Sequence, residues 1–249
     1  MGVRRINEVI EALDTIIADS IRDKSRIGYF AVLYKKMTVA VRDSIHRNEF
    51  LDCERMERLD VAFANRYLDA LEAYRGGRTV TDSWRVAFDM CGDKEPTVLQ
   101  HLYVGLAAHQ LLDLGIAAAE VAPGNLIGDL RGDFDHVNEI VGRLMHDMDA
   151  TIGRVSPWVG VLDKVAGVQY AVANRFGIYV AREIAWRSAE NLARLQSSAR
   201  EPHITTMDKR TALVGRAIAR PMGAIKLLAK FIRARESSDV VKTIRQLQA

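Results

Sequence analysis

Apolar residues recur at intervals of three and four along most of the chain. In the stretch 26–47, Phe30, Leu33, Met37 and Val41 fall on one face of a helix. The two-residue alternation of half-buried strands is almost absent. The pattern therefore predicts an all-α protein. We expect helices over about 3–22, 26–47, 53–75, a short stretch around Trp84 and Phe88, 96–121, 133–153, 157–168 and 172–198.

Helix boundary signals support this division. Gly76-Gly77 follows the third stretch, where glycine commonly ends a helix. Pro96 suits the first turn of the long helix that follows, and Asp133 is an expected N-cap of the next one. Pro221 is expected to kink or split the helical C-terminal region.

The stretch 96–121 differs from the others because it is apolar on all sides. A helix of this kind is buried, and Gly105 and Gly115 let neighbouring helices approach it closely. We therefore predict a single multi-helix bundle with this buried helix at its centre. Residues 1–200 would form the bundle, and residues 201–249 a basic amphipathic helical tail packed on it or appended to it.

Three ionisable residues interrupt this apolar helix. His109 and Asp113 are four residues apart, so their side chains meet on one face. His101 lies on an adjoining face, about 12 Å away along the axis. Burial of an unpaired carboxylate is costly, so Asp113 needs a histidine, an arginine or a metal beside it.

Three interpretations of this group remain open. His109 and Asp113 could form a buried pair that fixes the packing of the core. They could form a catalytic acid/base dyad, because a carboxylate holds an imidazole in one tautomer. They could also bind a divalent metal, with His101, His109, Asp113 and a carboxylate such as Asp60 or Asp133 as ligands.

Other polar residues fall near apolar faces. Asp60 lies beside the stripe of the third helix and faces either the core or solvent, and Tyr34 interrupts an apolar face. Arg182 and Trp186 could stack on one another, or Arg182 could neutralise Asp113 or bind an anion. The expected substrate-binding residues are Tyr34, Asn65, Asn138, Arg182 and Trp186.

Composition narrows the class of protein without identifying a reaction. Cys53 and Cys91 match no metal-ligand spacing and are expected to be reduced. The N-terminus has no signal-peptide pattern, and no uninterrupted run of about 18 apolar residues predicts a membrane span. We therefore expect a soluble, cytoplasmic protein. There is no glycine-rich phosphate loop and no Gly-x-Ser-x-Gly elbow.

Charge is unevenly distributed. The chain has a net charge of +3, but ten Lys/Arg against four Asp/Glu follow position 200, which leaves −3 for the rest. The tail is either a surface helix packed by its apolar face, a helix that contacts anionic lipid, or a docking surface for an acidic partner. No recognition module for nucleic acid accompanies the charge, so we expect no nucleic-acid partner.

Several segments together resemble a known family. They are Leu51-Asp52 through Arg66-Tyr67, His101 through Ala118, Asp133-Phe134 with Asn138, and Arg182-Glu-Ile-Ala-Trp186. Over about residues 28–195 the chain resembles the bacterial family catalogued as domain of unknown function 5995. That family typically has Asn-Ala-His where this chain has Ala107-Ala108-His109. The resemblance implies a compact helical domain with a polar motif that includes Asp60, His101, His109, Asp113 and Asp133, and it implies no activity.

The sequence thus favours a small-molecule enzyme with a pocket between helices. His109 would be the general acid/base, oriented by Asp113, and His101 and Asp60 would line the same cavity. Apolar walls would suit a hydrophobic substrate for a hydrolase, lyase or cyclase, acid/base or metal-assisted. The alternative is a non-catalytic helical binding or scaffold protein in which these residues form a structural network.

Overall fold

The computed structural model describes residues 2–156 and 170–249, which contain 11 α-helices and no strand. The all-α prediction is therefore confirmed. The predicted helix at 157–168 lies outside the described residues. The elements are α1 (Ile6–Arg22), α2 (Ile27–His46), α3 (Cys53–Arg75), α4 (Asp82–Cys91), α5 (Val98–Ala108), the π-helical η1 (His109–Asp113), α6 (Leu114–Val121), the 3₁₀ turn η2 (Gly124–Leu126), α7 (Ile127–Val155), α9 (Tyr170–Arg194), α10 (Ser197–Ala219), α11 (Gly223–Arg233) and α12 (Val240–Gln248).

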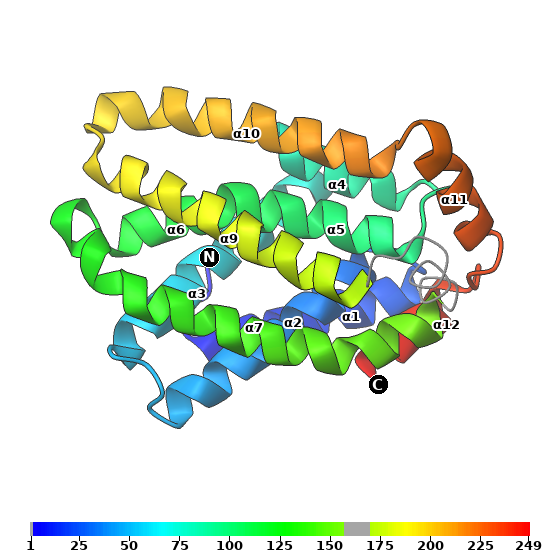
Figure 1. Ribbon diagram of the computed structural model, residues 1–249, viewed down its shortest axis with the longest axis horizontal. Helices are drawn as coiled ribbons and strands as arrows, with labels where there is room; N and C mark the ends of the chain where they lie inside the picture. The colour runs from blue at the N-terminus through cyan, green and yellow to red at the C-terminus, as the bar shows by residue number, and fades with distance from the viewer. Residues whose placement is uncertain (1, 157–169) are drawn as a thin grey trace.

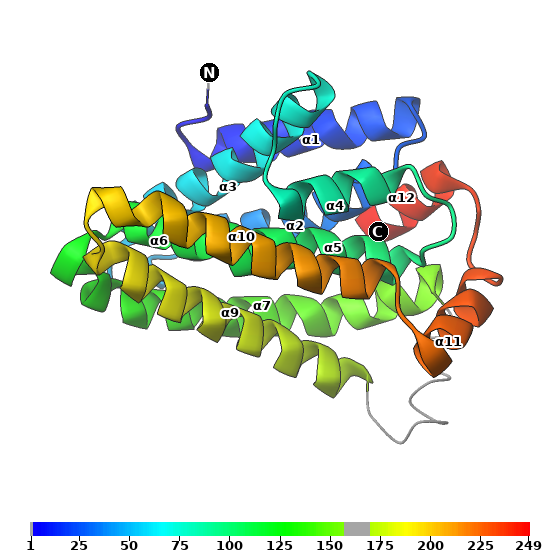
Figure 2. The ribbon, with the colours of Figure 1, turned by 90° about the horizontal axis from the view of Figure 1, so that it is seen from above.

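The helices surround one continuous rod made of α5, η1 and α6 (Figures 1 and 2). α5 packs against α2, α4 and α10, while α6 packs against α3 and α9. α1 and α2 form a hairpin on one side, and α7 crosses the other side between α2 and α9. The helix that the sequence predicted as central is thus enclosed on all sides, because its circumference is apolar.

Local sequence fixes where this rod begins and how closely its neighbours approach. The Thr97 hydroxyl accepts a hydrogen bond from the Gln100 backbone N–H, and Gln100 Oε1 accepts one from the Thr97 backbone N–H, which forms a capping box. Pro96 therefore precedes the N-cap and is not in the first turn. A Cβ on Gly115 would lie 2.9 Å from the Ala185 carbonyl oxygen of α9, so only glycine permits this approach.

By length and composition, the 24-residue span Val98–Val121 could cross a membrane. Inside the bundle, 89% of its most apolar window is buried. Burial to this degree is what the core helix of a helical bundle shows.

Two predicted boundaries are wrong. α7 begins at Ile127, ahead of the expected cap at Asp133, since the buried Ile127 and Leu130 extend its apolar stripe. Farther on, the expected helix 172–198 ends at Arg194, and α10 starts at Ser197 and continues to Ala219. The predicted boundary between residues 200 and 201 therefore falls within a helix, and α10 packs on α4 and α5.

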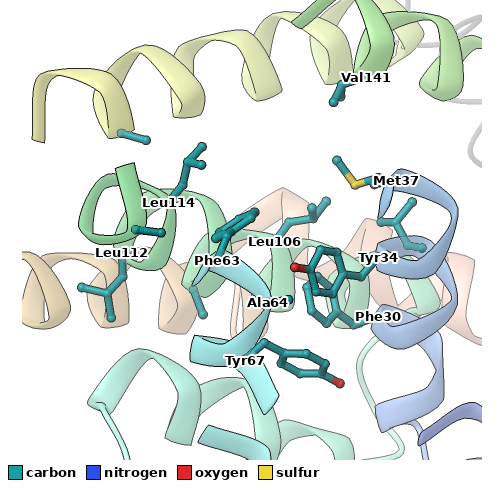
Figure 3. Packing of buried hydrophobic residues seen from close by; sticks show 14 of the residues in the cluster. Phe30, Tyr34, Met37, Phe63, Ala64, Tyr67, Leu106, Leu112, Leu114 and Val141 are labelled. Atoms are coloured by element: carbon teal, nitrogen blue, oxygen red, sulfur yellow. The ribbon is translucent and has the colours of Figure 1, made fainter. Parts of the chain in front are cut away.

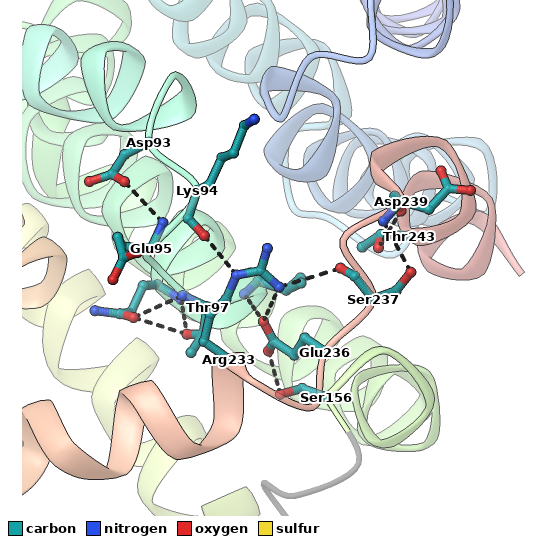
Figure 4. A network of polar contacts seen from close by, with 12 residues as sticks. Asp93, Lys94, Glu95, Thr97, Ser156, Arg233, Glu236, Ser237, Asp239 and Thr243 are labelled. Atoms are coloured by element: carbon teal, nitrogen blue, oxygen red, sulfur yellow. Dashed lines mark hydrogen bonds and ion pairs between the residues drawn. The ribbon is translucent and has the colours of Figure 1, made fainter.

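The C-terminal region is tied to the central rod by Glu236 (Figure 4). The Glu236 carboxylate accepts hydrogen bonds from the Val98 amide at 3.0 Å and the Ser156 hydroxyl at 2.7 Å. A negative charge is favourable at the N-terminus of α5, where backbone N–H groups lack partners. Beyond it, α12 packs on α1, α2 and α7.

The close contact at Gly115 gives a stability prediction. We expect Gly115→Ala to lower the free energy of unfolding by about 1–3 kcal/mol, because the opposing atom is backbone and cannot move aside. Gly142→Ala is the control, since nothing lies within 4 Å of a Cβ there, and alanine should stabilise α7 by about 0.5–1 kcal/mol. Urea unfolding measures both; equal effects would contradict the packing described here.

Candidate functional site

The central rod changes its winding at His109–Asp113, where it forms a π-helical turn. A π-turn inserted in an α-helix is uncommon and is frequent at functional sites. The turn begins at His109 and ends at Asp113, so the two ionisable residues predicted to meet occupy its ends. The periodicity of the sequence gave no sign of this wider turn.

Asp113 is the best-satisfied buried charge of the site. Its carboxylate accepts hydrogen bonds from Arg66 Nε at 2.9 Å, from Trp84 Nε1 at 2.9 Å and from His109 Nδ1 at 3.3 Å. Its side chain is 1% exposed. Arg66 neutralises the carboxylate, so the alternative that assigned this role to Arg182 is wrong.

His109 is held rigidly by this carboxylate and by aromatic rings. The imidazole stacks on Phe63 with ring centroids 3.5 Å apart and meets the edge of Tyr34 at 4.4 Å. Burial lowers the pKa of His109, although Asp113 opposes the shift. The ring is therefore neutral at neutral pH, and since a carboxylate only accepts, Nδ1 carries the proton. The lone pair is left on Nε2, which has no hydrogen-bond partner in residues 2–156 and 170–249.

A cavity of about 50 Å³ lies beside His109, between α2, α3, α5, α7 and α9. Its walls are mainly apolar, and Figure 3 shows Tyr34, Phe63, Leu106 and Val141 around this space. Within the described ranges, three buried polar atoms on residues that line it have no hydrogen-bond partner, Asp60 Oδ2, His109 Nε2 and Gln110 Oε1, while the hydroxyls of Tyr34 and Thr38 interact with one another. Buried polar groups without partners are rare in folded proteins and call for an explanation at each site.

Asp60 lines the same cavity as His109, as the enzyme interpretation required. The residue is 8% exposed, so the alternative of a solvated carboxylate is wrong. Burial first, and the nearby Glu57 second, raise the pKa of Asp60 to about 7. A substantial fraction of Asp60 is therefore protonated at neutral pH and can donate a proton. Burial also raises the pKa of Tyr34 well above its usual range, so its hydroxyl stays neutral.

Arg182 brings a buried cation to the cavity wall. It donates hydrogen bonds to Asn138 Oδ1 and to the Phe134 carbonyl oxygen, and its guanidinium lies 4.4 Å from the centre of the Phe134 ring. Burial lowers the pKa of Arg182 to about 10, so the group remains charged. Among the described residues it forms no ion pair with a carboxylate. A buried guanidinium that within the described chain is bonded only to neutral oxygens and stacked on a ring favours an anion in the cavity beside it.

Other predicted site residues lie elsewhere. His101 lines a separate space of about 10 Å³ near Arg26 and Cys91, and burial lowers its pKa to about 3. Asn65 exchanges two hydrogen bonds with the Val3 backbone, which fixes the N-terminal segment. Trp186 packs on Phe134 and Arg131, so the expected stack on Arg182 is wrong.

Asp133 has a structural role. Its carboxylate accepts hydrogen bonds from the Leu51 amide at 2.6 Å, the Asp52 amide at 3.1 Å and Arg55 at 2.9 Å. These bonds hold the segment before α3 onto α7. Within residues 2–156 and 170–249, no three His, Cys, Asp or Glu side chains gather to hold a metal ion. The possible ligands His101, His109, Asp113 and Asp133 do not converge.

Sequence analysis missed several residues of the site. Arg66 and Trp84 complete the carboxylate network, and Phe63 positions the imidazole. Gln110 lies in the π-turn and lines the cavity. A signal for Arg66 existed: Asp113 required a buried cation, and Arg66 follows Phe63 on the same helix as Asp60.

A second, larger hollow adjoins the cavity. This apolar groove, of about 510 Å³, lies between the central rod, α9 and α10. Leu106 and Gln110 line both spaces and form the wall between them. The cavity beside His109 and the apolar groove therefore share these two lining side chains.

Comparison with known proteins places the chain in a family. The model of the family of unknown function DUF5995 matches residues 6–221, which extends the resemblance predicted over residues 28–195. No curated protein and no solved structure matches the chain. The matched residues include the central rod, the carboxylate network and the residues that line the cavity. Since the match covers most of the chain, the chain belongs to the family of unknown function DUF5995.

Proposed function

We propose that this protein is a small-molecule enzyme that transfers protons in the cavity beside His109. His109 Nε2 acts as the general base, and protonated Asp60 acts as the general acid. Asp113, held by Arg66 and Trp84, is a positioning residue that keeps the imidazole in one tautomer. Arg182 binds an anionic group of the substrate.

The observation that carries this proposal is the group of three polar atoms around one cavity, on Asp60, His109 and Gln110, that have no partner in the described part of the chain. In a core that serves stability alone, each such atom costs about 1–3 kcal/mol. A bound substrate or ordered water must supply the missing partners. Burial favours the neutral forms of both Asp60 and His109. At neutral pH, Asp60 can therefore donate a proton and His109 can accept one.

This pair suits reactions in which one proton is removed and another is delivered. His109 can take a proton from a carbon acid or from an attacking water, and Asp60 can give one to the departing or newly charged atom. Hydrolysis, elimination and cyclisation all meet this description. Apolar walls favour a hydrophobic substrate, and Arg182 favours one that also carries a carboxylate or phosphate.

The second candidate is a non-catalytic binding or scaffold protein. The observation in its favour is that Asp113 has three partners and that His109 is stacked between aromatic rings, as in a structural network. Loss of His109 would still leave Asp113 paired with Arg66 and Trp84. Stability alone is therefore a poor discriminator, and activity has to be measured.

We expect His109→Gln to lower the rate of turnover at least about 100-fold, because glutamine cannot act as a base. His101→Gln is the matched control: it is a buried histidine of the same rod that does not line the cavity. Each protein is incubated in deuterated buffer with a pool of small hydrophobic carboxylates and phosphate esters. Mass spectrometry then detects consumption or deuterium uptake.

Loss of turnover in His109→Gln but not in His101→Gln, with both variants folded by circular dichroism, supports the enzyme. A compound that the wild type and His109→Gln convert at the same rate would contradict the role of His109. Binding of pool members without conversion would favour the scaffold or binding protein instead.

Asp60 gives a prediction for stability as a function of pH. Its pKa is raised from 3.8 in the unfolded chain to about 7 in the folded one. The resulting stabilisation is fully present below about pH 4 and is lost as the pH rises through 7. The loss is roughly 4 kcal/mol at 1.36 kcal/mol per pKa unit.

Urea unfolding of the wild type and Asp60→Asn at pH 5 and pH 8 tests this. Relative to the variant, the wild type should lose stability between the two pH values, because asparagine does not titrate. Asp69→Asn, at an exposed position of the same helix, is the control and should keep the wild-type dependence. Equal pH dependence in wild type and Asp60→Asn would show that Asp60 is not a buried acid.

A further inference from the structure

α11 is the least buried helix of the described chain. Among its residues only Ile232 is buried. Large apolar side chains are exposed on it and just before it: Met222 is 85% exposed, Ile225 67%, Leu227 71% and Leu228 37%. An isolated exposed leucine needs no explanation, but a contiguous apolar patch marks an interaction site.

The arrangement of these side chains is strongly amphipathic. At 100° per residue, Leu227, Phe231 and Leu228 fall on one side of the helix. Lys226 and Lys230 fall together on the other side. The buried Ile232 falls between Leu228 and Ile225 on the apolar side, and since it is the only buried residue of the helix, most of the apolar face is exposed.

The charge around α11 has a single sign. Residues 209–235 contain eight Lys/Arg and no Asp or Glu. Arg216, Arg220, Lys226 and Lys230 are exposed. The first 200 residues, in contrast, have a net charge of −3. Basic side chains and exposed apolar side chains therefore occur in the same segment of the chain.

The helix is also firmly attached at its C-terminal end. Arg233 donates to the Lys94 carbonyl oxygen at 2.8 Å, and the next turn of chain holds Glu236 on the N-terminus of α5 (Figure 4). Figures 1 and 2 both place α11 at one end of the bundle. The fold thus presents this helix outward from a fixed point.

We propose that α11 binds the surface of a lipid bilayer that contains anionic lipids. Its apolar face enters the boundary between headgroups and acyl chains, and its lysines remain among the phosphates. With 11 residues it is too short to cross a bilayer, which requires about 20. Charge complementarity between the lysines and lipid phosphates selects the anionic surface. The proposal is independent of the catalytic role of His109.

Co-sedimentation of the full chain with vesicles tests this proposal. We expect the protein to bind vesicles of phosphatidylcholine mixed with phosphatidylglycerol more tightly than vesicles of phosphatidylcholine alone. Added salt should weaken binding, because it screens the lysines. The affinity of the double variant Leu227→Ser/Leu228→Ser for vesicles should be at least about tenfold lower than that of the wild type, because the substitutions remove apolar surface that would be buried in the bilayer. Lys226→Gln/Lys230→Gln should lose the preference for anionic vesicles.

Leu51→Ser/Leu126→Ser is the matched control, because both leucines are exposed outside the tail. It should bind vesicles as the wild type does, and urea unfolding checks that every variant is folded. Absence of vesicle binding, equal binding to both vesicle types, or wild-type binding by Leu227→Ser/Leu228→Ser would each overturn the proposal. Binding to poly-glutamate but not to vesicles would assign the face to an acidic protein and would also overturn it.

Discussion

Burial of the Asp113 carboxylate is the constraint on which the rest of the site depends. A charge in the centre of an apolar helix is tolerated only if its lone pairs are filled and its charge is balanced. Arg66 balances the charge, and Trp84 and His109 fill the remaining positions. These groups come from α3, α4 and the central rod, so the demand of one carboxylate fixes how three elements pack.

The same constraint determines the chemistry available to His109. Because Nδ1–H is committed to Asp113, the free lone pair must be on Nε2, beside the cavity. Stacking on Phe63 prevents the ring from rotating. The imidazole therefore presents one atom, in one protonation state, to one space. An acid/base catalyst needs this arrangement.

The sequence predicted the fold well because the fold follows from periodicity. The apolar circumference of the 96–121 stretch was sufficient to place it at the centre. Spacing along the chain predicted that His109 and Asp113 meet, because they share one helix. Asp60, Tyr34 and Arg182 were named as site residues from their positions near apolar faces. Arg66 and Trp84 were missed, because spacing along one helix contains no distance to another. His101 was misjudged because adjoining faces of a helix can point into different spaces, with Phe30 lining both.

Energetics favour a functional over a purely structural origin for the cavity. A core that served stability alone could carry apolar residues of similar size at Asp60 and Gln110. Such a core would avoid the desolvation of two side chains whose buried polar atoms have no partner among the residues that the structure describes. The network at Asp113 does not require them, because its own partners are complete. Their presence around Nε2 of His109 is therefore explained better by a molecule that enters the cavity than by the stability of the bundle.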